Sequence, residues 1–142
     1  MTNDCPPHDY LLDAQVGFLL RRATQRHLTI FAALIPGLTP TQFAALAKLC
    51  ELGPTTQNAL GRATAMDAAT IKGVIDRLRD KGLIATTRDA EDRRRLFVEA
   101  TPAGTEAFGA ARTKALEISA ETLAPLSAFE QATFLDLLTR LT

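Results

Sequence analysis

At 142 residues with 16 basic and 16 acidic side chains, the chain fits one folded domain that needs neither a disulfide nor a metal to hold it together. No apolar run reaches the roughly 20 residues that cross a bilayer, and the polar N-terminus lacks the pattern of a signal peptide. With only two cysteines, Cys5 and Cys50, we expect a cytoplasmic protein with reduced thiols and no membrane association.

The charges are distributed unevenly along the chain although they cancel overall. Residues 62–95 carry nine basic against six acidic side chains, whereas residues 96–142 carry three against six. A local excess of positive charge is the electrostatic footprint of a nucleic-acid-binding surface. The neutral total therefore does not exclude DNA as a partner.

A long helix is predicted over residues 9–34, because apolar side chains recur there at three- and four-residue steps. The residues on that face are Leu12, Val16, Leu19, Ala23, His27, Ile30 and Leu34. Pro36 and Gly37 end the helix. A helix of this length exceeds what a small domain needs, so we expect it to pack against a second copy of the chain.

Three shorter helices are predicted next, over residues 40–52, 57–63 and 67–81. Thr39 and Gln42 form a Thr-x-x-Gln capping box at the start of the first of them. The third has an acidic N-cap and buries one face, which consists of Ile71, Val74, Ile75 and Leu78.

The hydrophobic period then changes to that of a β-hairpin. Residues 83–88 and 95–100 predict two strands around a polar tip at 89–94. A threonine cap followed by proline starts a long helix over 101–123, and a Ser-x-x-Glu capping box starts a last helix over 127–141.

Helix, helix, helix and hairpin in this order predict a winged helix-turn-helix. We expect a mainly α fold with a small β-hairpin wing, in which residues 39–101 form the DNA-binding lobe. Residues 1–38 and 102–142 supply N- and C-terminal dimerisation helices, so that the chain forms one interleaved domain.

The predicted third helix of the lobe has the width of a DNA major groove. Its face opposite the buried stripe presents Ala68, Ala69, Thr70, Lys72, Gly73 and Asp76. Small residues let the backbone approach the bases, while Lys72 and Thr70 reach a base edge or a phosphate. The alternative is a solvated face with an isolated lysine.

Three arginines, Arg93, Arg94 and Arg95, lie at the predicted hairpin tip. An arginine placed there enters a narrow minor groove, where the negative potential is enhanced. Asp92 is positioned to orient one of them through a bidentate pair. On its own, such a run is usually a solvated charged turn, but beside a groove-sized helix it favours DNA binding.

Several stretches of the chain resemble the MarR family. They are the helix end Asp-Arg-Leu-x-x-Lys-Gly-Leu-Ile at 76–84, the wing Asp-x-x-Asp-Arg-Arg at 89–94 and the helix start Thr-Pro-x-Gly at 101–104. The resemblance implies an obligate homodimer that binds a palindrome in double-stranded DNA, with repression as the default. It implies that Arg94 is the wing arginine with Asp92 as its support, and that Arg77 buttresses the wing or touches phosphate.

The chain departs from the family in the third helix of the predicted lobe, residues 67–81, which we call the reading helix. Where the family often has threonine then arginine, this chain has Lys72 then Gly73. The departure leaves the operator sequence open, but not the way in which the helix docks.

The family also binds effectors between its dimerisation helices and its DNA-binding lobe, and many members respond to phenolic or aromatic acids. On the first helix, His27 stands on an otherwise apolar face, and Arg21, Arg22 and Arg26 lie within two turns of it. We expect these residues to hold a small anionic aromatic effector, with the ring on apolar walls and the carboxylate on an arginine. The alternative is an interface histidine with three solvated arginines.

Two other functions are weighed against a ligand-responsive DNA-binding regulator. Cys5 precedes the first helix, where one branch of the family senses hydroperoxides, so redox sensing is the first alternative. The second is a winged helix that binds only proteins. An enzyme is not expected, because no phosphate loop, nucleophile grouping or metal-ligand spacing is present, and no cofactor is implied.

Overall fold

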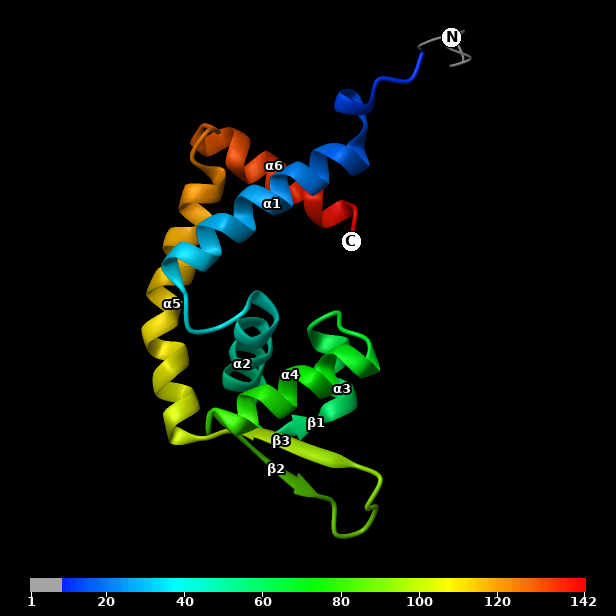
Figure 1. Ribbon diagram of the computed structural model, residues 1–142, viewed down its shortest axis with the longest axis vertical. Helices are drawn as coiled ribbons and strands as arrows, with labels where there is room; N and C mark the ends of the chain where they lie inside the picture. The colour runs from blue at the N-terminus through cyan, green and yellow to red at the C-terminus, as the bar shows by residue number, and fades with distance from the viewer. Residues whose placement is uncertain (1–8) are drawn as a thin grey trace, which may run out of the picture.

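The computed structural model describes residues 9–142 and confirms a mainly helical fold with a small sheet (Figure 1). In chain order the elements are a 3-10 turn (Leu12–Ala14), α1 (Val16–Leu34), α2 (Pro40–Leu52), β1 (Thr55–Thr56), α3 (Gln57–Ala63), α4 (Ala68–Asp80), β2 (Ile84–Arg88), β3 (Leu96–Ala100), α5 (Pro102–Leu123) and α6 (Ala128–Arg140). Helices α1 and α6 lie at one end of the molecule and α2–α4 with the sheet at the other, while α5 runs between the two ends (Figure 1). Among the described residues, no helix is long and apolar enough to cross a membrane.

Helix α1 begins seven residues later than the sequence predicts. Gln15 has an extended backbone, with φ −87° and ψ 139°, and this separates α1 from the short 3-10 turn before it. The Gln15 side chain donates instead to the carbonyl of Leu11, 3.0 Å away. The apolar period alone did not reveal this break, because Leu12 and Val16 keep helical spacing across it.

The predicted capping boxes are present and fix the starts of two helices. The hydroxyl of Thr39 accepts from the amide of Gln42 at 3.2 Å, and the Gln42 side chain accepts from the amide of Thr39 at 3.3 Å. Ser127 and Glu130 make the same pair of bonds at the start of α6. Each pair satisfies backbone donors that the helix itself leaves without partners.

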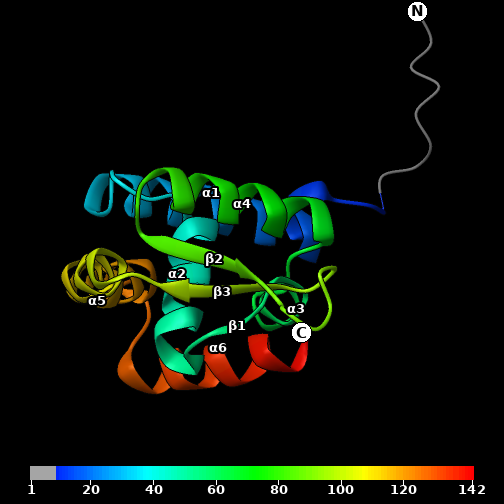
Figure 2. The ribbon, with the colours of Figure 1, turned by 90° about the horizontal axis from the view of Figure 1, so that it is seen from below.

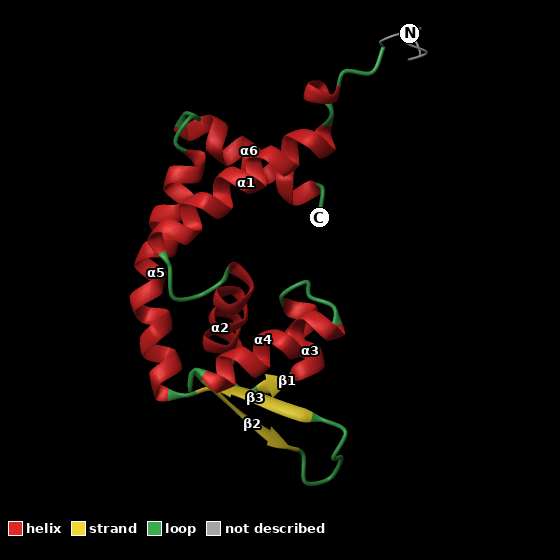
Figure 3. Cartoon of the chain, viewed as in Figure 1, coloured by secondary structure: helices red, strands yellow, loops and turns green. Residues whose placement is uncertain are grey.

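The sheet has three strands in the order β1-β3-β2, all antiparallel, and so contains one strand that the sequence does not predict (Figure 2). Strand β1 pairs Thr55 with Val98 and Thr56 with Phe97. Two residues are too few to show the alternation by which strands are recognised. The sheet is confined to the end of the molecule that carries the hairpin, and helices form the rest (Figure 3).

The buried side chains form two clusters of unequal size. The larger fills the space between α2, α3, α4 and the sheet and consists of Ala45, Leu46, Leu49, Leu60, Ile71, Val74, Ile75, Leu78, Ile84 and Val98. The smaller lies between α1 and α5 and contains Phe31, Ile35 and Ile118. Phe43 on α2 bridges the two, with its ring 6.2 Å from that of Phe31 and 5.9 Å from that of Phe108.

Hydrogen bonds and a close backbone contact join the start of α5 to the loop between α4 and β2. The hydroxyl of Thr101 accepts from the amide of Gly104 at 3.0 Å and donates to the carbonyl of Gly82 at 2.7 Å. A Cβ at residue 104 would collide with the carbonyl oxygen of Leu83. The Thr-Pro-x-Gly sequence therefore serves a physical need: threonine caps the helix, and only glycine allows the backbone contact.

Candidate nucleic-acid interface

Helices α3 and α4 form the predicted helix-turn-helix. The turn between them places Ala65 in the left-handed region, with φ 56°. The carboxylate of Asp67 then caps α4 by accepting from the amide of Thr70 at 2.7 Å. That hydrogen bond holds the pKa of Asp67 below its usual value. The cap is therefore charged at neutral pH and favours the helix through its N-terminal dipole.

Helix α4 buries the predicted stripe and presents the predicted face. Its four apolar residues Ile71, Val74, Ile75 and Leu78 are each at most 5% exposed. Ala68, Ala69, Thr70 and Lys72 are exposed, and Gly73 is half-buried. The side chains predicted to read DNA thus share one accessible face.

Gly73 leaves room for Arg77, one turn further along α4. The Arg77 guanidinium donates to the carbonyl of Gly73 at 3.2 Å, and a Cβ at residue 73 would lie 3.0 Å from the same nitrogen. In this geometry Arg77 lies along its own helix. The inference from family resemblance, that Arg77 buttresses the wing or touches phosphate, stays a prediction.

Asp92 orients Arg94 at the tip of the wing. One carboxylate oxygen accepts from the Arg94 amide at 3.0 Å and from its Nε at 3.2 Å. The bond from the Arg94 amide is the main cause that lowers the pKa of Asp92. The pair uses Nε rather than the bidentate fork that the sequence suggests. It leaves both terminal nitrogens of Arg94, whose side chain is 93% exposed, free to meet an anion.

The other tip arginines are held in different ways. The Arg95 guanidinium lies 5.5 Å from the centre of the Phe97 ring and 3.9 Å from a carboxylate oxygen of Asp89. Arg93 offers its carbonyl to Arg88, whose guanidinium donates at 3.1 Å. Within residues 9–142, Arg94 is therefore the tip arginine that is both oriented and unshielded.

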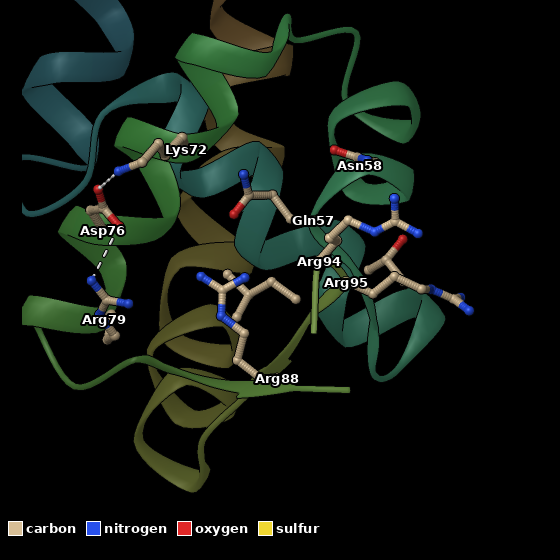
Figure 4. Close-up of a pocket in the computed structure, with 10 residues that line it drawn as sticks. Gln57, Asn58, Lys72, Asp76, Arg79, Arg88, Arg94 and Arg95 are labelled. Atoms are coloured by element: carbon tan, nitrogen blue, oxygen red, sulfur yellow. Dashed lines mark hydrogen bonds and ion pairs between the residues drawn. The ribbon is translucent and has the colours of Figure 1, made fainter. Parts of the chain in front are cut away.

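A basic hollow of about 400 Å³ separates α4 from the wing (Figure 4). Its lining comes from all three strands, α3, α4 and the tip and consists of Thr56, Gln57, Asn58, Lys72, Asp76, Arg79, Arg88, Arg94, Arg95 and Leu96. The polar lining residues that the sequence alone does not single out include Gln57, Asn58, Arg79 and Arg88. Arg79 follows Lys72 by seven residues, two helical turns, and this spacing could have revealed it.

Asp76 bridges two cations in this hollow. Its two carboxylate oxygens contact Lys72 at 2.9 Å and Arg79 at 3.2 Å (Figure 4). The hydrogen bond from Lys72 is the first cause that holds the pKa of Asp76 below its usual value. Lys72 is therefore part of an ion pair in this structure and is not a free cation.

A second cavity, of about 390 Å³, surrounds His27 between α1, α5 and α6. Its other lining residues are Leu20, Ala23, Thr24, Ser119, Thr122, Leu123, Phe134, Leu135 and Leu138. His27 is half-buried, and its Nδ1 lies 2.8 Å from the hydroxyl of Thr122. The predicted combination of one titratable ring with apolar walls is thus present, but it lies between α1, α5 and α6 and not between these helices and the DNA-binding lobe, where the family resemblance places effectors.

The three predicted effector arginines do not line this cavity. The guanidinium of Arg26 donates to the carbonyls of Thr122 at 2.7 Å and Glu121 at 2.8 Å, so it caps the C-terminal end of α5. Arg22 stacks over the ring of Phe18 at 5.9 Å. Arg21 is exposed, and no hydrogen bond or ion pair to another described residue holds it. The roles of these arginines in effector binding stay predictions.

Apolar side chains cover much of the surface of α1 and α6. Leu12, Val16, Leu19, Phe134 and Leu141 are between 40% and 69% exposed, and no residue of α6 is buried. Ile30 and Leu34, predicted on the same stripe, pack inward against the Phe31 cluster instead. An exposed apolar surface of this size is typical of a subunit interface.

Other chemistry has little support among residues 9–142. No group of three or more metal-ligating side chains occurs there. Burial raises the pKa of the half-buried Cys50 thiol, which makes it a weak nucleophile. Cys5 lies outside the described residues.

Comparisons with known proteins agree with this geometry. The MarR family model matches residues 38–96. The transcriptional repressor NicR of Pseudomonas putida is 40% identical over 140 residues, which cover 97% of this chain and 87% of NicR. A probable transcriptional regulator from Pseudomonas aeruginosa is 54% identical with a TM-score of 0.90, covering 93% of this chain and all of that one.

A third protein, BpsR of Bordetella bronchiseptica, is 38% identical with a TM-score of 0.89, over 93% of this chain and 96% of BpsR. Its structure concerns the regulation of BpsR DNA binding by 6-hydroxynicotinic acid. The chain therefore belongs to the MarR family of dimeric, non-enzymatic transcriptional regulators that bind DNA.

Proposed function

We propose that this regulator represses transcription from a palindromic operator and is released by a small aromatic acid. Its α4 helices enter successive major grooves, and the Arg94 side chains reach the flanking minor grooves. The observation that supports this docking best is the orientation of Arg94 by Asp92 at the tip of the wing. As a protein that acts on chromosomal DNA, it works in the cytoplasm.

The proposed DNA contacts divide into those that recognise bases and those that position the protein on the DNA backbone. Thr70 and Lys72 on the exposed face of α4 are the candidates for base edges, and Ala68, Ala69 and Gly73 admit the backbone close to them. Arg94 and its neighbours Arg93 and Arg95 supply charge to the DNA backbone and minor groove. Arg77 is assigned to a phosphate, which it reaches by leaving the carbonyl of Gly73.

The effector is a small aromatic carboxylate, and the cavity around His27 is its site. Apolar walls accept the ring, while His27 and Thr122 offer polar contacts to a ring substituent. Among Arg21, Arg22 and Arg26, Arg21 is the first candidate for the carboxylate, because the other two are engaged with Phe18 and with α5. The similarity to BpsR suggests a hydroxylated pyridine carboxylate.

Release follows from a difference in affinity between two arrangements of the dimer. The DNA-bound dimer must hold its reading helices roughly 34–36 Å apart, one turn of DNA. A ligand that binds better when the helices are spaced differently lowers operator affinity by the ratio of its two affinities. The hydrogen bond between His27 and Thr122 joins α1 to α5. A ligand that breaks this bond and binds either side chain therefore acts on both helices.

Fluorescence anisotropy with operator DNA tests the proposal, with 6-hydroxynicotinic acid as the first probe and benzoic acid for comparison. We expect the wild-type protein to be released from DNA at acid concentrations near the dissociation constant of the acid. We expect His27→Ala to respond more weakly to the acid, while its DNA binding without the acid is unchanged. Arg112→Ala, an exposed arginine of α5 outside the cavity, is the matched control. An unaltered response of His27→Ala would remove the cavity from the mechanism.

The two alternative functions are supported to different degrees. A winged helix that binds only proteins is not supported, because the family binds DNA. Redox sensing through Cys5 concerns a residue outside the described part of the chain. It is tested by comparing operator binding of the wild type and Cys5→Ser after organic hydroperoxide, where a shared response would exclude that thiol.

A further inference from the structure

Lys81 lies at the C-terminal end of the reading helix but directs its side chain away from that helix. Its backbone amide closes α4 by donating to the carbonyl of Arg77 at 3.1 Å. Its ammonium donates to the carbonyl of Gly37 at 2.8 Å and to the side-chain oxygen of Gln42 at 3.0 Å. These two acceptors lie 44 and 39 positions earlier in the chain.

The acceptors belong to the corner between α1 and α2. Gln42 is 5% exposed, and its oxygen also accepts from the amide of Thr39 in the capping box. Gly37 lies between the end of α1 and that box. The ammonium thus joins a structure that is already fixed, and no carboxylate among the described residues pairs with it.

Leu38 packs the corner against the larger cluster, and the hydrogen bonds of Lys81 add a separate link at the end of α4. A cavity of about 420 Å³ lies between the last turns of α1, the corner and Lys81, and its apolar lining includes Leu28, Phe31 and Ile35. Side chains therefore do not fill the space between the end of α1 and the end of α4. A bond from a charged donor is stronger than one between neutral groups, which suits it to hold two elements across such a gap.

We propose that Lys81 is a positioning residue that sets the orientation of α4 relative to the dimerisation helices, and that it does not bind phosphate. Helix α4 is 13 residues long, about 20 Å at 1.5 Å per residue. A small rotation at its tethered end moves the far end, which carries Ala68 and Ala69, by several times the displacement at Lys81. The tether therefore controls the spacing between the two reading helices of the dimer.

The salt dependence of operator binding distinguishes this role from a phosphate contact. A plot of log K against log salt has a negative slope, and the loss of one phosphate contact reduces the magnitude of that slope by about 0.9. We expect Lys81→Met to weaken operator binding about tenfold, the effect of losing a charge-assisted bond, with the slope unchanged. Arg77→Met, which removes the guanidinium assigned to a phosphate, is the comparison, and the magnitude of its slope is expected to fall by about 0.9.

Lys81→Arg keeps a charged donor and is expected to recover most of the affinity. If the magnitude of the salt slope of Lys81→Met is smaller than that of the wild type by about one unit, Lys81 contacts a phosphate and the proposal is overturned. Wild-type affinity of Lys81→Met would overturn it as well.

A direct measurement keeps the test informative if Lys81→Met is less stable than the wild type. Spin labels at Ala69→Cys, in a Cys5→Ser, Cys50→Ser background, report the distance between the reading helices of the dimer. We expect one narrow distribution with Lys81 or Lys81→Arg and a broadened or shifted one with Lys81→Met. Identical distributions in all three proteins would show that Lys81 does not position α4.

Discussion

The DNA-binding lobe and the helical end of the molecule differ in how they use their apolar residues. The lobe buries its stripes within the chain, as the ten-residue cluster around Leu46 and Ile75 shows. Helix α6 buries no residue, and α1 buries only Phe31. The lobe is thus stabilised by its own core, whereas α1 and α6 require a partner chain to cover them. Stability and dimerisation should therefore respond to different substitutions.

The largest expected effect is that of a charge placed on the exposed apolar face of α1. Leu19→Glu loses the burial of a leucine, about 1.5–3 kcal/mol, and places an unpaired carboxylate in the interface twice per dimer. We expect the dimer to dissociate at micromolar concentration, as measured by light scattering.

Leu52→Glu is the matched control for this substitution. Leu52 is 53% exposed, close to the 48% of Leu19, but it lies at the end of α2 in the lobe. We expect Leu52→Glu to remain a dimer. Equal dissociation of both variants, or of neither, would contradict the division between the two regions.

The next effect concerns the junction of the two regions at Gly104. Gly104→Ala drives a methyl group into the carbonyl of Leu83, so the start of α5 must move. We expect a loss of about 3 kcal/mol, the upper range for overpacking, seen as a lower Tm. Gly109→Ala on the same helix meets nothing within 4 Å and should raise stability by about 0.5–1 kcal/mol. A Gly104→Ala protein as stable as the wild type would refute the close contact.

A smaller effect is confined to the wing and should leave the dimer intact. Arg94→Ala removes the oriented tip arginine and should weaken operator binding by about 1–3 kcal/mol in anisotropy titrations. Arg93→Ala is the control, because Arg93 lacks the carboxylate partner that Asp92 supplies to Arg94. If both variants lose equal affinity, orientation by Asp92 has no consequence for binding.

The smallest effect lies in the turn of the helix-turn-helix. Ala65→Gly relieves a left-handed backbone at φ 56° and should stabilise the lobe by about 0.5 kcal/mol after the entropy of glycine is counted. Ala63→Gly, on α3 two residues earlier, should destabilise it by about 0.5–1 kcal/mol. Thermal unfolding of the two variants in opposite directions would confirm the conformation of the turn.

Features encoded over a few residues were predictable from the sequence. The capping boxes at Thr39 and Ser127 and the buried stripe of α4 depend on spacings of three and four residues, and the structure contains them. The two-residue strand β1 and the extended backbone of Gln15 have no such signature.

Features that join distant parts of the chain were not predictable in this way. Arg26 caps the end of α5 across 95 positions and more, and Lys81 reaches the α1–α2 corner across 44. The basic hollow also gathers Gln57 and Arg88 from separate elements. Spacing along the sequence carries no information on such pairs, because tertiary packing decides them.

The ion pairs of Asp76 with Lys72 and Arg79 bear on how the regulator searches a chromosome. Sequence-independent attraction to DNA grows with the number of phosphates that free cations neutralise, and Asp76 occupies two such cations in the basic hollow. We therefore expect the protein to dwell more briefly on random DNA than the arginine and lysine count of residues 62–95 implies. If fewer copies are held at non-cognate sites, a small cellular pool is enough to keep an operator occupied.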